Sequence, residues 1–244
     1  MTRQRLDELL VQRGLYTSRS RARDAIARGT VTVDGVVAGK PAQNTNREAL
    51  IETLDEARRY VSRSALKLIS GINFFNISVK DLNCLDIGAS TGGFTQVLLE
   101  QGAAHVTAID VGHGQFDASL KSNSRVTSIE GLNARDLTTD HLTHAIDLIV
   151  CDVSFISLKL ALPAALDLVD SGTRLIALIK PQFEAGRDAV GRGGIVSDPQ
   201  EHERVCKEIS EFLSVENWQF IGITPSSIEG GDGNKEFLIA AVKS

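Results

Sequence analysis

Apolar residues in the first fifty positions recur first at helical spacing and then in short alternating runs. The leucines of Arg5–Arg13 share one face of a predicted helix. A second helical pattern follows, capped by Thr17 or Ser18 and ending at Gly29. Two short apolar runs then meet at Asp34-Gly35, a dipeptide that strongly favours a β-hairpin. These patterns predict a compact helix–helix–hairpin module.

The pattern changes near residue 62, where buried strands begin to alternate with helices. The expected strands are NCLDIG, HVTAID, RVTSIE, IDLIVCD, RLIALIK, WQFIGIT and EFLIAAV, and the expected helices include GFTQVLLEQG, SLKLALPAALDLV and EHERVCKEISEFL. This alternation predicts an α/β fold with a mainly parallel sheet that binds ligands at its carboxyl strand ends. We therefore expect a small domain over residues 1–61, including a linker, and a larger domain over residues 62–244.

Charge is distributed unevenly between these two regions. Residues 1–60 carry 11 Lys and Arg against 8 Asp and Glu, whereas the remainder carries 15 against 23, giving the net charge of -5. A basic end on an acidic body indicates a nucleic-acid contact at the N-terminus. A solvated helix face would give the same small excess, so charge alone leaves both interpretations open.

Cysteine usage and hydropathy indicate the cellular compartment. The three cysteines lack the paired spacing of a zinc site or a disulfide framework, which favours a reducing environment. The N-terminus has no apolar signal core, and no apolar run approaches the roughly 18 residues of a membrane span. We therefore expect a cytoplasmic protein without a membrane segment.

The first candidate binding element is the glycine-rich turn LDIGASTGGFT (85–95), which joins a strand to a helix. Glycine allows close backbone approach to a ligand, and the N-terminus of the following helix favours a carboxylate or phosphate. The glycine spacing fits a dinucleotide fingerprint poorly, so another nucleoside ligand is favoured over a dinucleotide-dependent oxidoreductase. Asp110 ends the next strand, where its carboxylate can bind ribose hydroxyls or form a turn with Gly112.

Two further strand ends carry candidate catalytic groups. Asp152 ends one strand and could instead cap the next helix, a role that Ser154 or Ser157 could fill equally well. Phe155, which follows Ser154, is an aromatic residue that could stack on a base or belong to the core. Lys180 ends the apolar strand RLIALIK and must reach a carboxylate, a ligand or solvent. A nearby second cation would make the neutral amine of Lys180 more accessible.

Lys67 and Glu236 are less distinctive by position. Lys67 lies in a helical run, SRSALKL, where spacing alone favours a surface lysine, although it could be that second cation. Glu236 begins the last strand, where an isolated carboxylate is ordinarily exposed to solvent. The glycine-rich segment 183–198 follows the strand ending in Lys180, and it is either a substrate lid or an ordinary flexible loop.

Several long motifs resemble one known family. SRSALKL, LDIGASTGGFTQVLL, AIDVGHGQ, DVSFISLKLALP, IKPQFEAGRDAVGRGGIV and GNKEFLIA are similar to TlyA-type, or hemolysin-A-like, rRNA methyltransferases of the FtsJ-like superfamily. Residues 1–60 resemble a small α+β RNA-binding domain first described in a ribosomal protein. The resemblance implies a Rossmann-like methyltransferase sheet, mainly parallel with the last strand antiparallel, and S-adenosylmethionine-dependent 2′-O-methylation of cytidine in ribosomal RNA.

The resemblance also assigns residues to roles. It places a catalytic tetrad on Lys67, Asp152, Lys180 and Glu236. It places the S-adenosylmethionine site on Asp86, Gly88, Ser90, Thr91, Gly92, Gly93, Phe94, Asp110, Asn133, Asp152 and Phe155. Asn133 stands where the superfamily often has Asp, and an amide can still hydrogen-bond a base edge. Thr91 and Phe94 replace the superfamily's usual Pro and Trp.

A ribose hydroxyl is a weak acid and needs either a positioned base or cations that stabilise the alkoxide. We expect Lys180 to be that base or stabiliser, Lys67 to assist it, and Asp152 and Glu236 to orient the lysines, with no metal required. RNA affinity would come from Arg5, Arg13, Arg19, Arg21, Arg23, Arg28 and Lys40. The expected partners are ribosomal RNA and ribosomal subunits. The alternatives are a non-catalytic RNA-binding or ribosome-assembly factor and, following the family's older name, a cytolysin.

Overall fold

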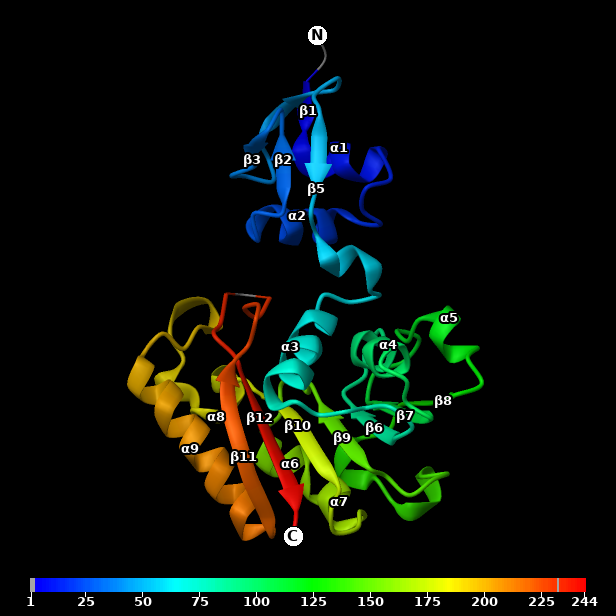
Figure 1. Cartoon of the computed structure of the whole chain (residues 1–244). Helices are drawn as coiled ribbons and strands as arrows, with labels where there is room; N and C mark the ends of the chain where they lie inside the picture. Colours follow the sequence, from blue (N-terminus) through cyan, green and yellow to red (C-terminus); the bar gives the residue numbers. More distant parts are fainter. Residues whose placement is uncertain (1–2, 232) are drawn as a thin grey trace. The chain divides into compact units, whose positions relative to one another are not determined.

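The computed structural model describes residues 3–231 and 233–244, and it divides into two compact units, residues 1–59 and residues 60–244 (Figure 1). The N-terminal unit contains β1 (Arg3–Arg5), α1 (Leu6–Gln12), α2 (Arg19–Ala27), β2 (Val31–Val33), β3 (Val36–Val37), β4 (Asn44–Asn46), β5 (Ile51–Thr53) and a 3-10 turn (Glu56–Arg59). The two predicted helices and the hairpin are confirmed. The pairing of β1 with β4 was not predicted, because three-residue strands carry too little pattern to detect.

Local capping explains why the N-terminal elements begin and end where they do. Ser18 starts α2 by accepting a hydrogen bond from the backbone N–H of Arg21. Asp34 and Gly35 both have positive φ, 49° and 80°, which is the backbone conformation of a two-residue hairpin turn. Leu6 and Leu10 of α1 pack with Ile26 of α2 in a small core of their own.

A buried ion pair fastens the end of α2 to the chain that follows β5. Arg28 donates two hydrogen bonds to Asp55, at 2.9 and 3.0 Å, and a third to Asp24 at 2.8 Å. The Asp55 side chain is only 2% exposed, and Tyr16 donates a further hydrogen bond to it at 3.1 Å. These contacts offset the cost of burying the carboxylate and hold its pKa below the ordinary value despite desolvation.

We predict that Arg28→Ala destabilises the N-terminal unit by roughly 3 kcal/mol, since it leaves the carboxylate of Asp55 buried and unpaired. Hydrogen exchange of the α1 and α2 amides in the full chain measures the effect. Arg23→Ala, an exposed arginine of the same helix, is the matched control and should change stability by less than about 0.5 kcal/mol. Equal protection of the two variants would show that the buried pair contributes little.

The C-terminal unit is built round a seven-stranded sheet. Its elements are α3 (Ala65–Phe75), β6 (Asn83–Ile87), α4 (Gly93–Glu100), β7 (His105–Asp110), α5 (Ala118–Lys121), β8 (Val126–Glu130), β9 (Leu148–Cys151), α6 (Leu158–Ala161), α7 (Pro163–Asp167), β10 (Arg174–Ile179), α8 (Pro181–Glu184), α9 (Pro199–Val215), β11 (Trp218–Pro225) and β12 (Phe237–Lys243). The strand order is β11-β12-β10-β9-β6-β7-β8, and β12 is antiparallel to both of its neighbours. The expected mainly parallel sheet with an antiparallel last strand is confirmed.

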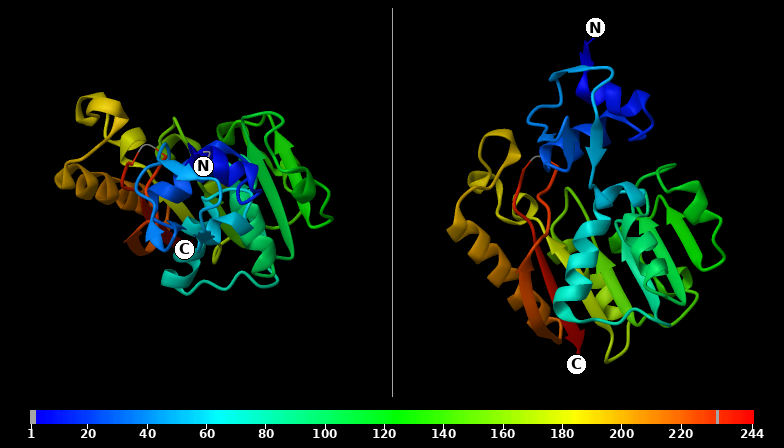
Figure 2. Two further views of the ribbon diagram at one scale, coloured as in Figure 1. Left: turned by 90° about the horizontal axis from the view of Figure 1, so that it is seen from above. Right: turned by 45° about the horizontal axis from the view of Figure 1, so that its top comes forward.

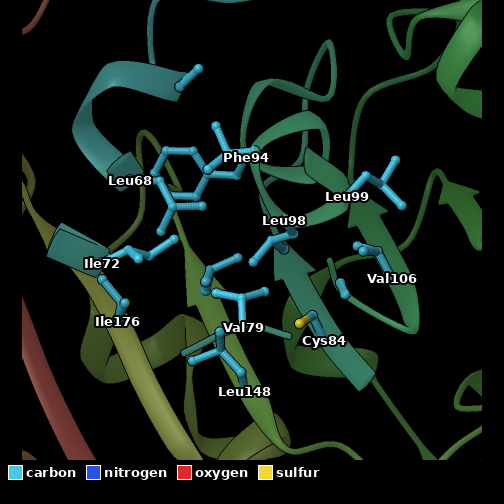
Figure 3. Close-up of a cluster of buried hydrophobic side chains, with 14 of the residues drawn as sticks. Leu68, Ile72, Val79, Cys84, Phe94, Leu98, Leu99, Val106, Leu148 and Ile176 are labelled. Atoms are coloured by element: carbon cyan, nitrogen blue, oxygen red, sulfur yellow. The ribbon is translucent and has the colours of Figure 1, made fainter. Parts of the chain in front are cut away.

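Helices cover both faces of this sheet (Figures 1 and 2). One face packs against α3 and α4, where Leu68 and Phe94 belong to the same buried cluster as strand residues such as Leu148 (Figure 3). The other face packs against α6, α7 and α9. Successive residues of a strand alternate between these two cores, which is why the strands read as continuous apolar runs.

The predicted helix SLKLALPAALDLV is interrupted. It divides into α6 and α7 because Pro163 lacks an N–H and starts a new helix at its own first position. The late helix α9 begins as predicted, with Asp198 accepting a hydrogen bond from the N–H of Gln200 and Pro199 in the first turn.

Candidate functional site

A cavity of about 150 Å³ opens beside the carboxyl ends of three neighbouring strands, β6, β9 and β10. It is lined by Ser62, Ser64, Gly88, Ala89, Ser90, Thr91, Phe94, Asp152, Ser154 and Lys180. From β6 the chain proceeds to β7 on one side, whereas β9 and β10 lie on the other side. The cavity therefore sits at the topological switch point, where α/β sheets bind their ligands.

The glycine turn after β6 packs closely against other parts of the unit. Gly88 has a φ of 81°, and a Cβ there would lie 2.9 Å from the carbonyl oxygen of Asp152. A Cβ on Gly93 would lie 2.7 Å from the hydroxyl oxygen of Ser64. These glycines thus let the turn approach the β9 loop and the start of α3, whereas the sequence pattern indicated only a close approach to a ligand.

Lys180 lies between two partners at the end of β10. Its Nζ is 2.7 Å from Asp152 Oδ1, an ion pair without the angles of a hydrogen bond, and it donates a hydrogen bond to Ser154 Oγ at 2.9 Å. Lys180 is 7% exposed, so nearly all of the residue is removed from solvent. A buried ammonium of this kind needs such partners, and the remaining exposed surface lines the cavity.

Lys67 and Glu236 form a second buried pair. The Nζ of Lys67 is 2.5 Å from Glu236 Oε2, although the two residues are 169 positions apart in the chain. Lys67 is 5% exposed and Glu236 is 4% exposed. The surface positions that spacing alone favoured for both residues are therefore wrong, because packing of α3 on the sheet removes both side chains from solvent.

Strand register explains how the two pairs come to the same edge. β12 runs antiparallel to β10, with Phe237 opposite Ile179. The next residues outward are therefore Glu236 on one strand and Lys180 on the other. The structure brings the four tetrad residues to the carboxyl edge of the central strands as two lysine–carboxylate pairs.

Asp110 and Asn133 are near strand ends and already have partners. Asp110 accepts hydrogen bonds from the N–H groups of Ser90 and Gly112, both at 2.7 Å, and so ties the glycine turn to β7. Each carboxylate oxygen retains a further acceptor position for a ligand hydroxyl. Asn133 uses its Oδ1 to accept from the backbone and side chain of Arg135, so its amide N–H₂ is the group that remains for a ligand.

Phe155 is the most exposed large apolar residue of the site region. It is 92% exposed, and its φ of 65° is rare for a residue with a large side chain. Its ring lies 5.1 Å from that of Phe183, which follows β10. The core position considered for Phe155 is therefore wrong, and its ring is free to stack on a flat ligand.

Four cavity residues were not predicted: Ser62, Ser64, Ala89 and Ser154. Ser62 and Ser64 lie just before α3, and Ser64 donates a hydrogen bond to Ser62 at 3.0 Å. All four occur within or beside motifs that the sequence highlights, but small residues next to stronger candidates give no separate signal. The helix cap considered for Ser154 belongs to Ser157 instead, and Ser154 accepts a hydrogen bond from Lys180.

The glycine-rich segment 183–198 is anchored at its far end. Asn234 donates to the carbonyl of Gly194 at 2.9 Å and accepts from the N–H of Val196 at 3.0 Å. His202 of α9 contacts the carbonyl of Val196 at 2.8 Å. Hydrogen bonds therefore tie the segment to Asn234, two residues before Glu236.

The predicted RNA-binding residues divide into two groups. Arg5 and Arg19 pair with the buried Asp7, Arg13 donates to the carbonyls of Ala49 and Arg47, Arg21 donates to the carbonyl of Ala57, and Arg28 binds Asp55. Arg23 and Lys40 are exposed, and their side chains have no hydrogen bond or ion pair within residues 3–231 and 233–244. Of the predicted set, these two are the ones available to a ligand without losing an internal contact.

Asp86 is a buried carboxyl in β6 and does not line the cavity. It is fully buried and accepts a hydrogen bond from Thr95 Oγ1 at 2.7 Å, while Oδ1 has no partner among the described residues. Desolvation raises the pKa of Asp86 to about 7, partly offset by Thr95, and the neighbouring Asp152 and Asp110 raise it further. Because folding raises the pKa of Asp86, this carboxyl lowers the free energy of unfolding as it ionises. Its protonated form at low pH carries no such penalty, and the penalty grows as pH rises towards 7.

We predict that between pH 5 and pH 8 the wild-type protein loses roughly 2–3 kcal/mol of stability relative to Asp86→Asn. Denaturant unfolding, followed through the fluorescence of the buried Trp218, measures both curves. If the difference between the two proteins does not change with pH, Asp86 is not the titrating group.

Comparisons with known proteins agree with this architecture. Residues 60–243 match the FtsJ-like methyltransferase model, and residues 4–51 match the S4 domain model. The chain is 43% identical over 238 residues to the 16S/23S rRNA (cytidine-2′-O)-methyltransferase TlyA of Mycobacterium tuberculosis, covering 97% of this chain and 89% of the relative. It is 41% identical to Hemolysin A of Brachyspira hyodysenteriae, covering 96% and 98% of the two chains.

Among solved structures, a Streptococcus thermophilus protein described as a hemolysin superposes on this chain with a TM-score of 0.78. The two sequences are 39% identical, and the match covers 100% of this chain and 90% of that one. In the part of the chain that the structure describes, every helix is too short or too polar to span a lipid bilayer. The family matches and the sheet topology lead to one conclusion: the chain belongs to the FtsJ-like methyltransferases, in the TlyA group, with an S4 domain at its N-terminus.

Proposed function

We propose that this protein transfers a methyl group from S-adenosylmethionine to the ribose 2′-hydroxyl of a cytidine in ribosomal RNA. The observation that carries the proposal is the amine of Lys180, held by Asp152 and Ser154 at the wall of the switch-point cavity. The TlyA relative of M. tuberculosis, whose name states this reaction, supports the choice of substrate.

The residues round the cavity fit the parts of this cofactor. The cavity is smaller than the roughly 300–1,000 Å³ of typical ligand pockets, so it would take the amino acid and sulfonium portion. Backbone N–H groups at the start of α4 would bind the carboxylate. Asp110, at the end of the adjacent strand, would accept the ribose hydroxyls, and the amide N–H₂ of Asn133 would contact the base.

When bound, the cofactor supplies an electrophilic methyl group on a positively charged sulfur. The residues of this chain must then align the ribose oxygen with that methyl group, a contribution on the order of 7–11 kcal/mol in favourable cases. Lys180 would hold the hydroxyl oxygen and stabilise negative charge as the oxygen–carbon bond forms and the sulfur–carbon bond breaks. The hydroxyl proton would pass to Lys180 when its amine is neutral, or to water otherwise.

The pair of Lys67 and Glu236 would support this centre from the adjacent strand. Its carboxylate satisfies the Lys67 ammonium within the buried region, and the pair ties α3 to the start of β12, which strand pairing places beside the end of β10. Lys67 would add positive potential near the developing alkoxide, while Asp152 orients the amine of Lys180.

We predict that Lys180→Ala lowers methyl transfer to ribosomal subunits by about 10²–10⁴-fold or more, because the positioned acid–base or charge-stabilising group is lost. Radiolabelled methyl incorporation measures activity, and calorimetry should show S-adenosylmethionine affinity changed by less than about threefold. Lys121→Ala, on the exposed end of α5, is the matched control. Normal turnover by Lys180→Ala would remove Lys180 from the mechanism, and a wild-type protein that binds subunits without methylating them would favour an assembly factor.

RNA affinity would come mainly from the N-terminal unit, in a cytoplasmic encounter with ribosomal subunits. Arg23 and Lys40 would contact phosphates directly, because their charges are uncommitted. Arg5 and Arg19 are 41% and 52% exposed and could share their guanidinium groups between Asp7 and RNA. We assign Arg28 to stability, since its side chain is only 17% exposed and three internal bonds engage it.

We predict that the double variant Arg23→Ala/Lys40→Ala weakens RNA binding and lowers the slope of log K against log salt by roughly 1.5–2, or about one per lost phosphate contact. Filter binding at several salt concentrations measures this slope. Lys207→Ala/Lys243→Ala removes the same charge from the C-terminal unit and should leave the slope unchanged. An unchanged slope in the first variant would place the RNA contact elsewhere.

A further inference from the structure

Two short segments carry two of the four proposed catalytic groups, Asp152 and Lys180. The loop after β9 holds Asp152, Ser154 and Phe155, and the segment after β10 holds Lys180 and Phe183. They touch through the Lys180 ion pair, the Lys180–Ser154 hydrogen bond and the contact of the two aromatic rings. Any movement of one segment against the other would therefore change the position of the amine relative to its partners.

Glu184 ties these segments together at their far ends. Its Oε2 accepts a hydrogen bond from Ser157 Oγ at 2.6 Å, and its Oε1 accepts one from the N–H of Leu158 at 2.7 Å. Both carboxylate oxygens of an α8 residue are thus used to bind the first turn of α6. Ser157 also accepts from the N–H of Lys159, so a single hydroxyl caps α6 and binds Glu184.

The loop between these contacts is anchored mainly at its start, where the N–H of Asp152 donates to the carbonyl of Ile87 and Val153 packs on the core. Phe155 is nearly fully exposed and adopts a left-handed backbone conformation, which costs free energy for a residue of its size. The loop is held at one end by β9 and at the other end by Ser157 and Leu158. Glu184 is the connection from that second end to the segment that carries Lys180.

The surrounding charges do not replace these two hydrogen bonds. Lys159 of α6 pairs with Glu208 of α9 at 2.7 Å, and Arg204 donates to the carbonyl of Ala185 at 3.0 Å. Burial raises the pKa of Glu184, because the two donors and the charge of Lys159 only partly offset desolvation, and the charge of Glu208 acts against them. Keeping this carboxylate charged in its buried position costs free energy, and the benefit is the pair of hydrogen bonds that connects α8 to α6.

We propose that Glu184 is a positioning residue for methyl transfer, which bridges the two segments so that Asp152 and Ser154 meet the amine of Lys180. The inference rests on the proposed function, and it gives Glu184 an indirect role, through the loop that carries Asp152 and Ser154. Its role depends on hydrogen-bond geometry rather than charge. A glutamine retains one acceptor for Leu158 N–H and can donate its amide to Ser157 Oγ, whereas an alanine loses both contacts.

The test compares Glu184→Ala, Glu184→Gln and the control Glu211→Gln, which makes the same charge change on the exposed side of α9. The alanine variant should lower kcat by about tenfold or more, since small misplacements of reacting groups cost up to about a hundredfold. The glutamine variant should retain kcat within about threefold. It should also melt no lower than the wild type, because it removes a desolvated charge.

The affinity for S-adenosylmethionine distinguishes a misplaced Lys180 amine from a binding site that has lost its structure. S-adenosylmethionine binding by folded Glu184→Ala should change far less than kcat. Ser157→Ala, which removes one donor to Glu184 and the cap of α6 but no charge, should lower kcat in the same direction by a smaller factor. If Glu184→Ala does not fold, Ser157→Ala and Glu184→Gln still decide the matter.

The outcomes distinguish the two proposals. A wild-type protein that transfers no methyl group to ribosomal subunits defeats the proposed function. Wild-type activity together with unchanged kcat in Glu184→Ala and Ser157→Ala overturns the positioning role alone. A glutamine variant as slow as the alanine variant also overturns it, because the requirement would then be for charge.

Discussion

Burial of two lysines at one edge of a parallel sheet is the constraint on which the rest of the site depends. An unpaired ammonium in such a position would be far too costly, so each lysine requires a carboxylate within ion-pair distance. Asp152 and Glu236 supply these carboxylates at 2.7 and 2.5 Å. Breaking either pair would leave a buried charge, so the fold itself protects the arrangement that the proposed chemistry needs.

Topology supplies the carboxylates from distant parts of the chain. Asp152 reaches the edge because β9 is parallel to β10 and ends beside it. Glu236 reaches the same edge for the opposite reason: β12 is antiparallel, so its beginning, rather than its end, lies there. A wholly parallel sheet would have placed the first residue of β12 at the other edge, away from Lys180.

The sequence predicts the elements of the fold well because hydrophobic periodicity and capping are local signals. The strands and Asp198 before α9 follow from such patterns. Asp110, Asp152 and Lys180 were also detectable, since each is a polar residue at the end of an apolar run. Lys67 and Glu236 were not, because their burial depends on a pairing across 169 positions and on the direction of β12. Only the resemblance to a family indicated them.

In the N-terminal unit, too, the sequence shows which residues are charged but not which of them are already paired. Its excess of three positive charges suggests a surface for a polyanion. The structure commits Arg13 and Arg21 to backbone carbonyls and Arg28 to a buried carboxylate, so these cations stabilise loops and helix ends. Net charge counts every cation equally, whereas affinity for RNA depends on those that can meet a phosphate without giving up an internal partner. A basic face can therefore be smaller than the charge of its domain implies, and its strength is determined by which arginines the fold has already used.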